Sequence, residues 1–298
     1  MEKVSFGQRL EGLALRALFA VTGLTRRVHA SAVGGFIGRH IGPRLSITRR
    51  ALRHLAEAMP ELSRVQQNKI IGEMWDNLGR VALEYPHIAR IRVYEPGSPV
   101  EITGLEHLDA AVASGKPIIL FSGHLANWEI GALAVVQRGL HLLQIYRSAN
   151  NPAVEAMMVA FRKSIGVEAV PKGARGGRRS ATVIKEGGVM GLLVDQKMND
   201  GIPVPFFGRD AWTAPALAKL ALRYNAVVIP WRVERLPRST FRLRVFPAME
   251  LPATGDPVDD VRRVMTEVNA LLERWIRDTP GQWFWLHRRW PAEKESGR

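Results

Sequence analysis

Short apolar runs alternate with helical patterns along most of the chain after about residue 100. The apolar runs at 117–122, 141–146 and 189–195 indicate buried strands, and apolar residues recur at helical spacing in the segments between them. Strands that alternate with helices are typical of an α/β domain with a largely parallel sheet. We therefore predict the α/β class, with a largely parallel central sheet flanked by helices.

Helical patterns occupy the chain from about residue 48 to 94. A helix at 51–59 is predicted to stop at Pro60, and Ser63 is a suitable N-cap for a second helix. A long helix at about 258–277 is predicted near the other end, followed by the aromatic tail QWFWLHRRW at 282–290. The two tryptophans inside this tail, Trp283 and Trp285, are predicted to pack in the structure.

The first 50 residues combine apolar residues near helical spacing with nine basic and only two acidic residues. A spanning helix needs about 20 mostly apolar residues, and here Arg16 interrupts the apolar run. An amphipathic helix on an anionic membrane surface fits this pattern better, although a tilted single span stays open. We predict an N-terminal helical membrane-association segment at 1–60 and a second domain at 61–298.

Composition narrows the possible chemistry. The chain of 298 residues has no cysteine, which excludes disulfides and thiolate catalysis. Its eight histidines are scattered without a close pair, so we predict no metal and no cofactor. A net charge of +14 favours an anionic partner. A non-catalytic basic protein that binds lipid or nucleic acid is therefore a rival to an enzyme.

One polar pair follows the strand at 117–122, in the stretch SGHLANWE. His124 comes directly after this strand, and Glu129 follows five residues later. Positions five apart lie about 140° around a helix axis, so the two cannot meet within one helix. They can meet if His124 lies in the turn and Glu129 in the first turn of a helix whose N-cap is Asn127. Functional groups gather at the carboxyl ends of parallel strands, where His124 is predicted to lie.

An imidazole held by a carboxylate is a general base that needs a hydroxyl to activate. Ser122 is the nearest hydroxyl in the chain, but G-x-S-x-G is missing, which disfavours an acyl-enzyme on Ser122. A substrate hydroxyl is the better interpretation. Taken alone, the pair is equally compatible with a polar contact that has no catalytic role.

Further motifs follow in order between residues 116 and 290. They are GHLANWE, IYRSANNP, AFRK, GLLVDQ, VPFFG, TAPALAKLALRYNAVVIP and QWFWLHRRW. This ordered set resembles the bacterial lipid A biosynthesis acyltransferases, within the glycerolipid and lysophospholipid acyltransferases. The chain departs from the family near Arg16, which interrupts the N-terminal membrane helix that relatives usually carry.

The resemblance implies a glycerolipid-acyltransferase-like fold and transfer of an acyl chain from acyl carrier protein to a lipid hydroxyl. It implies that His124 deprotonates this hydroxyl and that Glu129 orients His124, without an acyl-enzyme. It also implies that Arg162 grips an acceptor phosphate or the oxyanion, and that Asp195, at a strand end, holds either a basic residue of the site or the acceptor substrate.

Four further arginines are predicted as substrate or carrier contacts from position and charge. Arg147 directly follows a strand and could contact a phosphate or pantetheine. The arginines of GARGGRR, Arg175 with Arg178 and Arg179, could contact the acidic carrier protein or lipid phosphates, since the stretch lacks a nucleotide-binding pattern.

The predicted partners are therefore acyl carrier protein, an anionic glycolipid acceptor and the inner membrane surface, with no nucleic acid. The predicted location is the cytoplasmic face of the inner membrane, through peripheral or monotopic attachment or a single N-terminal span. The same chemistry on a phosphatidylinositol mannoside, a lysophospholipid or an ornithine lipid remains an alternative.

Overall fold

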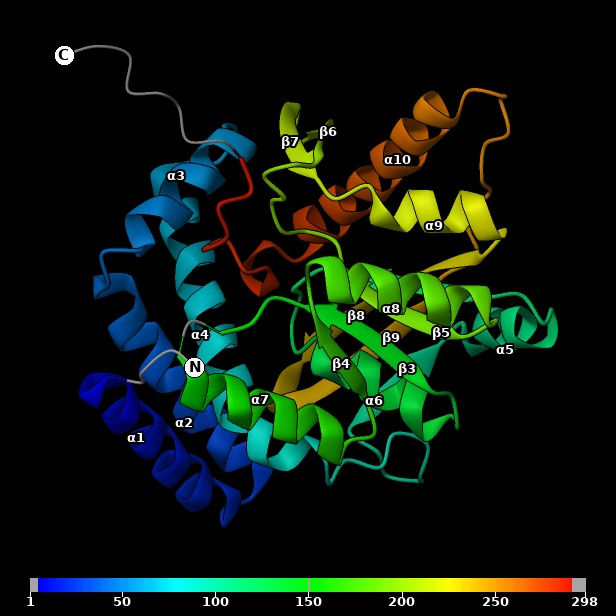
Figure 1. The fold of residues 1–298 in the computed structure, drawn as a ribbon. Coiled ribbons are helices and arrows are strands. Elements are labelled where there is room, and N and C mark those ends of the chain that lie inside the picture. The colour runs from blue at the N-terminus through cyan, green and yellow to red at the C-terminus, as the bar shows by residue number, and fades with distance from the viewer. Residues whose placement is uncertain (1–4, 150, 291–298) are drawn as a thin grey trace.

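Helices pack together at the N-terminal side of the molecule (Figure 1). The computed structural model describes residues 5–149 and 151–290, so residues 1–4 of the predicted membrane segment lie outside it. The N-terminal elements are α1 (Phe6–Gly23), α2 (Arg27–Ile41), the 3-10 turn η1 (Gly42–Arg44), α3 (Thr48–Ala58) and α4 (Arg64–Ile88). Among the described residues, no helix has an apolar stretch that could cross a bilayer.

Close contact between α2 and α4 depends on glycine. A Cβ atom on Gly79 would overlap the carbonyl oxygen of Gly34, and one on Gly38 would overlap the carbonyl of Trp75. Helix α4 begins as predicted at Ser63, whose hydroxyl accepts the backbone N–H of Gln66 at 3.3 Å in a capping box. The first feature holds α2 against α4, and the second fixes where α4 begins.

The central sheet is largely parallel, which confirms the predicted class. It has seven strands in the order β1-β9-β8-β2-β5-β3-β4, and only the β8–β9 pair is antiparallel. The strands are β1 (Val100–Thr103), β2 (Ile118–Ser122), β3 (Leu142–Tyr146), β4 (Glu168–Pro171), β5 (Val189–Leu193), β8 (Val227–Leu236) and β9 (Thr240–Val245).

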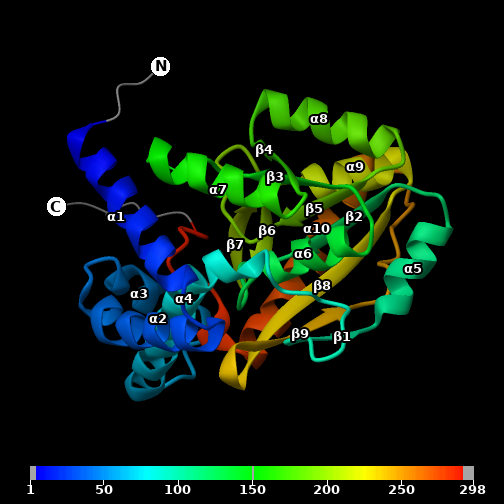
Figure 2. The ribbon, with the colours of Figure 1, turned by 90° about the horizontal axis from the view of Figure 1, so that it is seen from below.

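Helices cover both faces of this sheet (Figures 1 and 2). One face carries α8 (Ala174–Lys185), α9 (Ala216–Tyr224) and α10 (Pro257–Asp278), and the other carries α5 (Leu105–Ala113), α6 (Glu129–Gln137) and α7 (Pro152–Ser164). The central strand β2 is buried on both faces: Ile119 and Phe121 enter one core, and Ile118 and Leu120 enter the other. The predicted helix at 258–277 is confirmed as α10.

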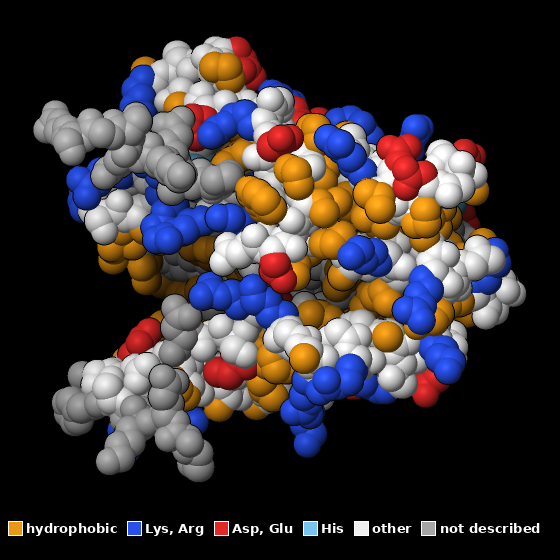
Figure 3. Space-filling view, turned by 45° about the horizontal axis from the view of Figure 1, so that its top comes forward, with side chains coloured by type: hydrophobic (Ala, Val, Ile, Leu, Met, Phe, Trp, Pro, Cys, Tyr) orange, Lys and Arg blue, Asp and Glu red, His pale blue; other side chains and the backbone are white. Residues whose placement is uncertain are grey.

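The remaining elements lie between residues 202 and 282. They are the hairpin β6 (Ile202–Phe206) and β7 (Arg209–Thr213), and the 3-10 turns η2 (Pro237–Ser239) and η3 (Pro280–Gln282). The tail after η3 buries Trp283 and Trp285, as predicted, at 1% and 0% exposure. Figure 3 shows that the surface is hollowed at one edge, with Lys and Arg side chains along the border of the hollow.

Candidate active site

His124 lies where β2 ends and the chain turns toward α6, as the sequence predicted. The turn is held by the C-terminal tail: Phe284 donates its backbone N–H to the His124 carbonyl at 3.2 Å, and Ala126 donates to Gln282 at 2.9 Å. Gly123 passes so close to Asp195 that a Cβ atom there would lie 3.3 Å from the carboxylate. The turn therefore brings the imidazole against the end of the neighbouring strand.

Asp195 holds His124 in place. The Asp195 Oδ1 accepts from the Nδ1 of His124 at 2.7 Å, and its Oδ2 accepts from the backbone N–H of His124 at 2.7 Å. The indole N–H of Trp283 also donates to this Oδ2, at 2.8 Å. Asp195 is fully buried, and burial alone would raise its pKa, but His124 and these hydrogen bonds hold the pKa well below its usual range. The carboxylate therefore stays ionised and fixes the tautomer of the base.

The side chain of Glu129 does not make the contact with His124 that the sequence predicted. Glu129 begins α6 as expected, but its side chain turns inward, is 1% exposed and is not the partner of the His124 Nδ1. Its Oε1 accepts from the Tyr85 hydroxyl at 2.8 Å and from Arg162 at 3.1 Å. The expectation that Glu129 orients His124 is wrong. Because β2 pairs with β5, Asp195 just after the end of β5 lies beside His124 and binds its Nδ1 instead.

Arg162 likewise faces Glu129 in the interior. Burial would lower the pKa of Arg162, but Glu129 and Tyr85 raise it overall, so the guanidinium stays charged. It also stacks over Tyr146, 4.8 Å from the ring centroid. Burial and then Glu129 raise the pKa of Tyr85 well above its ordinary value. The cluster ties α4, α6 and α7 together behind the turn that carries His124.

The N-cap prediction for α6 is also wrong. Trp128 occupies the cap position without a side-chain hydrogen bond. Asn127 instead donates to Glu84 of α4 at 2.9 Å, inside a buried network in which Arg235 binds both oxygens of Glu84. The amide side chain therefore anchors the turn to α4 rather than capping its own helix.

His287, in the aromatic tail that follows η3, is a second imidazole at the site. Its ring lies edge-on to His124 with the centroids 4.7 Å apart. The Nε2 of His287 is buried and has no hydrogen-bond partner among the described residues. Burial, and then the charge of His124, lower the pKa of His287 to about 3, so the ring is neutral near pH 7.

His124, Asp195 and His287 are also the group of described residues that could hold a metal ion, with ligand atoms within 4.8 Å of one another. The Asp195 Oδ1 already accepts the His124 N–H in this arrangement. A metal bound there would occupy the imidazole that the site offers as a base. The arrangement fits proton transfer at His124 directly.

The sequence comparisons now bear on this geometry. A profile of the bacterial lipid A biosynthesis acyltransferases matches residues 11–292. The chain belongs to this family. It is 27% identical to a lipid A biosynthesis acyltransferase of Haemophilus influenzae over 262 residues, which are 85% of this chain and 78% of that relative.

The relatives of this acyltransferase are named for two different lipids. The chain is 24% identical to the lipid A biosynthesis lauroyltransferase of Escherichia coli over 253 residues, 82% of this chain and 78% of the relative. It is 26% identical to a phosphatidylinositol mannoside acyltransferase of Mycobacterium tuberculosis over 206 residues, 66% of this chain and 62% of the relative. The chain is therefore an acyltransferase of a family that includes both names.

Within the acyltransferase, the other predicted positions lie after parallel strands of the same sheet. Arg147 follows β3 and is exposed, and Arg175 is exposed in the first turn of α8, after β4. The carboxyl ends of β2, β3, β4 and β5 form one edge, so these arginines lie along the edge that carries His124 and Asp195. Their substrate contacts stay predictions. Ser122 is buried at 5% exposure, and its carbonyl accepts from Val194.

Proposed function

We propose that the acyltransferase moves an acyl chain from the thioester of acyl carrier protein to a hydroxyl of a lipid A precursor. The observation that carries this proposal is the His124–Asp195 pair at the end of β2. The carboxylate occupies Nδ1, which leaves Nε2 as the basic nitrogen. The His124 side chain is 14% exposed, so a bound hydroxyl can reach this nitrogen.

The proposed reaction has two proton transfers. The Nε2 of His124 takes the proton of the acceptor hydroxyl while its oxygen forms a bond to the thioester carbonyl carbon. Asp195 stabilises the resulting imidazolium. When the tetrahedral intermediate collapses, the carbon–sulfur bond breaks, and the imidazolium returns the proton to the departing thiolate. The products are an ester and the free thiol of the carrier, and no acyl-enzyme forms.

The oxyanion of that intermediate needs hydrogen-bond donors. His287 supports this role because its ring is neutral, lies beside His124 and has a buried Nε2 without a described partner. In the Nε2–H tautomer it donates to the oxyanion. Arg162 is less suited than the sequence suggested, since its charge is already paired with Glu129. We assign Glu129 and Arg162 to positioning the turn and α7.

The donor is proposed to dock beside α8. Arg175 and Arg178 are exposed on this helix, whereas Arg179 is paired with Glu168 at 2.7 Å. Acyl carrier protein is acidic, so complementary charge would speed its encounter with the enzyme. Arg175 and Arg178 are therefore the better candidates of the three arginines.

The N-terminal helices are proposed to rest on the inner membrane, at its cytoplasmic face. Eleven of the seventeen large hydrophobic side chains that are exposed in the described residues lie between Leu13 and Ile47. Arg9, Arg16 and Arg39 are exposed among them. Apolar side chains that enter the interface, with arginines facing anionic lipid, explain this combination through peripheral or monotopic attachment.

A second candidate keeps the chemistry and changes the acceptor. The identity to a phosphatidylinositol mannoside acyltransferase is 26%, against 27% to a lipid A biosynthesis acyltransferase, so similarity alone does not separate the two acceptors. Both candidate acceptors are anionic glycolipids, which suits the basic surface.

Transfer in a purified system tests this function. The enzyme is mixed with acyl carrier protein thioester and either a lipid A precursor or a phosphatidylinositol mannoside, and the acylated lipid is detected by mass spectrometry. The variant His124→Ala should lose about 10²–10⁴-fold in rate, whereas His141→Ala, at an exposed position, should not. Acylation of the mannoside alone would select the second candidate. No acylation of either lipid, or equal rates for the two variants, would contradict the proposal.

A further inference from the structure

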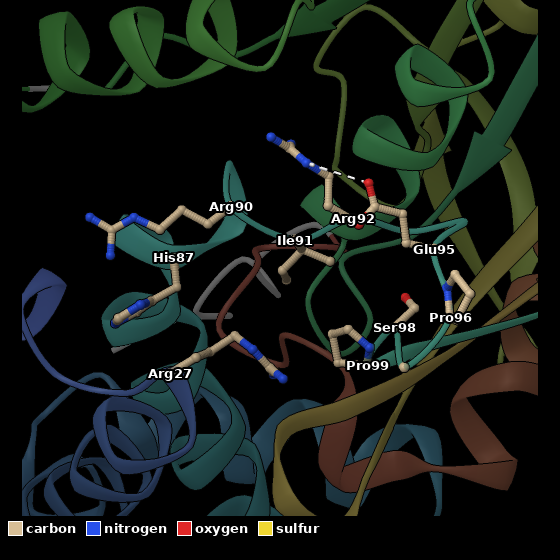
Figure 4. A pocket seen from close by; sticks show the side chains of 10 residues that line it. Arg27, His87, Arg90, Ile91, Arg92, Glu95, Pro96, Ser98 and Pro99 are labelled. Atoms are coloured by element: carbon tan, nitrogen blue, oxygen red, sulfur yellow. Dashed lines mark ion pairs between the residues drawn. The ribbon is translucent and has the colours of Figure 1, made fainter.

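A pocket that does not include His124 lies between the start of α2 and the chain that links α4 to β1 (Figure 4). Its volume is about 280 Å³. It is lined by Arg27, His87, Arg90, Ile91, Arg92 and residues 95–99. This volume can hold a phosphate with part of the group to which it is attached.

The pocket is positively charged. Arg27, Arg90 and Arg92 line it, and Glu95 is the acidic residue among the lining residues. Arg92 and Glu95 stand together at one rim with a separation of 4.0 Å, a weak and exposed pair. Burial, and next the charges of Arg90 and Arg27, lower the pKa of His87, against a backbone hydrogen bond that raises it. The pocket therefore carries a net positive charge at neutral pH, which comes from its three arginines.

Arg27 is held rigidly as the inner wall. Its Nη1 donates to both the carbonyl and the hydroxyl of Ser239, and Ser239 in turn donates to the buried Glu84. A guanidinium has five N–H donors in a fixed fork, so this anchoring leaves others on the same plane. Figure 4 shows Arg27 extending toward Ser98 and Pro99. Arg90 and Arg92 are exposed at the rim, and Figure 4 shows their side chains directed away from Arg27. A fixed fork with exposed arginines at the rim offers charge-assisted donors to phosphate oxygens.

The position of the pocket relates it to the membrane face and to the reaction. Strand β1 runs opposite to β2, so the start of β1 lies at the same edge of the sheet as His124. Three strand spacings separate β1 from β2, a lateral distance on the order of 15 Å. Leu24, which is 89% exposed, lies three residues before Arg27. A lipid headgroup at the membrane surface could therefore reach this pocket.

We propose that this pocket binds a phosphate group, at a site separate from the acyl-transfer centre. The phosphate can belong to a lipid headgroup or to a soluble phosphate, and both present the same oxygens to the arginines. The inference goes beyond the proposed acyl transfer and does not depend on it.

Two double variants of the full chain test the site. The pocket variant R90Q/R92Q removes two rim charges and leaves Arg27 and its contact with Ser239 intact. The control variant R262Q/R274Q removes the same charge from exposed positions on α10. Calorimetry with inorganic phosphate, in a buffer without phosphate, should show saturable binding to the intact protein and the control. The pocket variant should bind at least about tenfold more weakly, since it lacks two charge-assisted donors.

Vesicles then identify the source of the phosphate. Arg90 also donates to the carbonyl of Gly23 at the end of α1, so replacing Arg90 can displace α1. Binding to phosphatidylcholine vesicles, which carry no net charge, is the control for such a displacement. If the source is a lipid, binding to phosphatidylglycerol vesicles should fall further in R90Q/R92Q than in R262Q/R274Q. If both variants bind these vesicles alike while only R90Q/R92Q loses inorganic phosphate, the site takes a soluble phosphate.

The proposal is overturned if inorganic phosphate does not bind the intact protein saturably, or binds both variants equally. Thiol release with detergent-dispersed acceptor is measured on the same samples, and R90Q/R92Q should keep the intact rate. A failure of acyl transfer in the intact protein would refute the proposed function and leave the phosphate result standing.

Discussion

Replacing Asp195 by asparagine tests the pairing that the structure shows and the sequence did not predict. The side chains are nearly the same size, so the cavity is kept. Asp195 accepts three N–H groups, two from His124 and one from Trp283. An asparagine has one acceptor oxygen and one NH₂ group, which only donates. The NH₂ group must therefore face either the Nδ1 of His124 or the two N–H donors that now contact Oδ2.

The expected loss follows from this mismatch. If the NH₂ group faces Nδ1, that nitrogen must become the acceptor and Nε2 carries the proton, so the imidazole can no longer take one from the acceptor. A misplaced tautomer at a general base reduces kcat by about 10²–10⁴-fold. The change in KM should be small because Asp195 is fully buried and its carboxylate oxygens are taken by His124 and Trp283. The free energy of unfolding should fall by about 3 kcal/mol, since a buried charge-assisted network loses its acceptor.

A thiol-reactive dye follows release of the carrier thiol, and the chain adds no background because it has no cysteine. The matched control is Asp200→Asn, the same substitution at an exposed position nearby. The double variant with His124→Ala should lose no more activity than His124→Ala alone, since both changes remove one function. Folded Asp195→Asn enzyme with the kcat of the intact chain would refute the reasoning.

Three further predictions concern the membrane, the donor and acid stability. Leu24→Glu, at an 89% exposed position, should weaken binding to anionic vesicles without lowering Tm, and unchanged sedimentation with vesicles would count against the membrane face. Arg175→Glu with Arg178→Glu should raise KM for acyl carrier protein donors but scarcely for acyl-CoA, and equal losses would place these arginines elsewhere. The pKa of His287 is lowered to about 3 in the folded chain, so only the unfolded chain gains this proton as pH falls below about 6.5. Neutral His287 therefore lowers the free energy of unfolding by about 2 kcal/mol at about pH 5 relative to neutral pH. In denaturant titrations, His287→Gln should remove this pH-dependent loss, and an unchanged pH dependence would show that His287 is not neutral in the folded chain.

Local pattern was sufficient for the elements and for the position of His124. The apolar run that ends at Ser122 predicted β2, and Ser63 predicted the start of α4, because both signals are contained within a few residues. The alternation of such segments also predicted the parallel sheet. Local signals of this kind need no knowledge of which strands become neighbours.

The partner of His124 depends on a contact between distant segments. Asp195 lies 71 residues from His124, and only the pairing of β2 with β5 brings them together. The sequence offered Glu129 because it was close in the chain, while its side chain pairs with Arg162 of α7. Asn127 failed as an N-cap for the same reason, since Glu84 of α4 competes for its amide.

His287 shows what a better use of the sequence could have found. Its tail alternates buried tryptophans with polar residues, and the bridge between Leu125 and Trp283 makes it a neighbour of the turn that carries His124. The aromatic pattern predicted that the tail packs, but not against which segment. A polar residue between buried tryptophans is a signal that the tail lines a site.

The central claim is acyl transfer to a lipid hydroxyl with His124 as the base. Its most direct test is mass spectrometry of the lipids of cells that lack the gene, after complementation with the intact gene or with His124→Ala. We predict that one lipid A species loses the mass of one acyl chain in the deletion, regains it with the intact gene and does not regain it with His124→Ala at equal protein level. Full restoration by His124→Ala, or lipids unchanged by the deletion, would contradict the account.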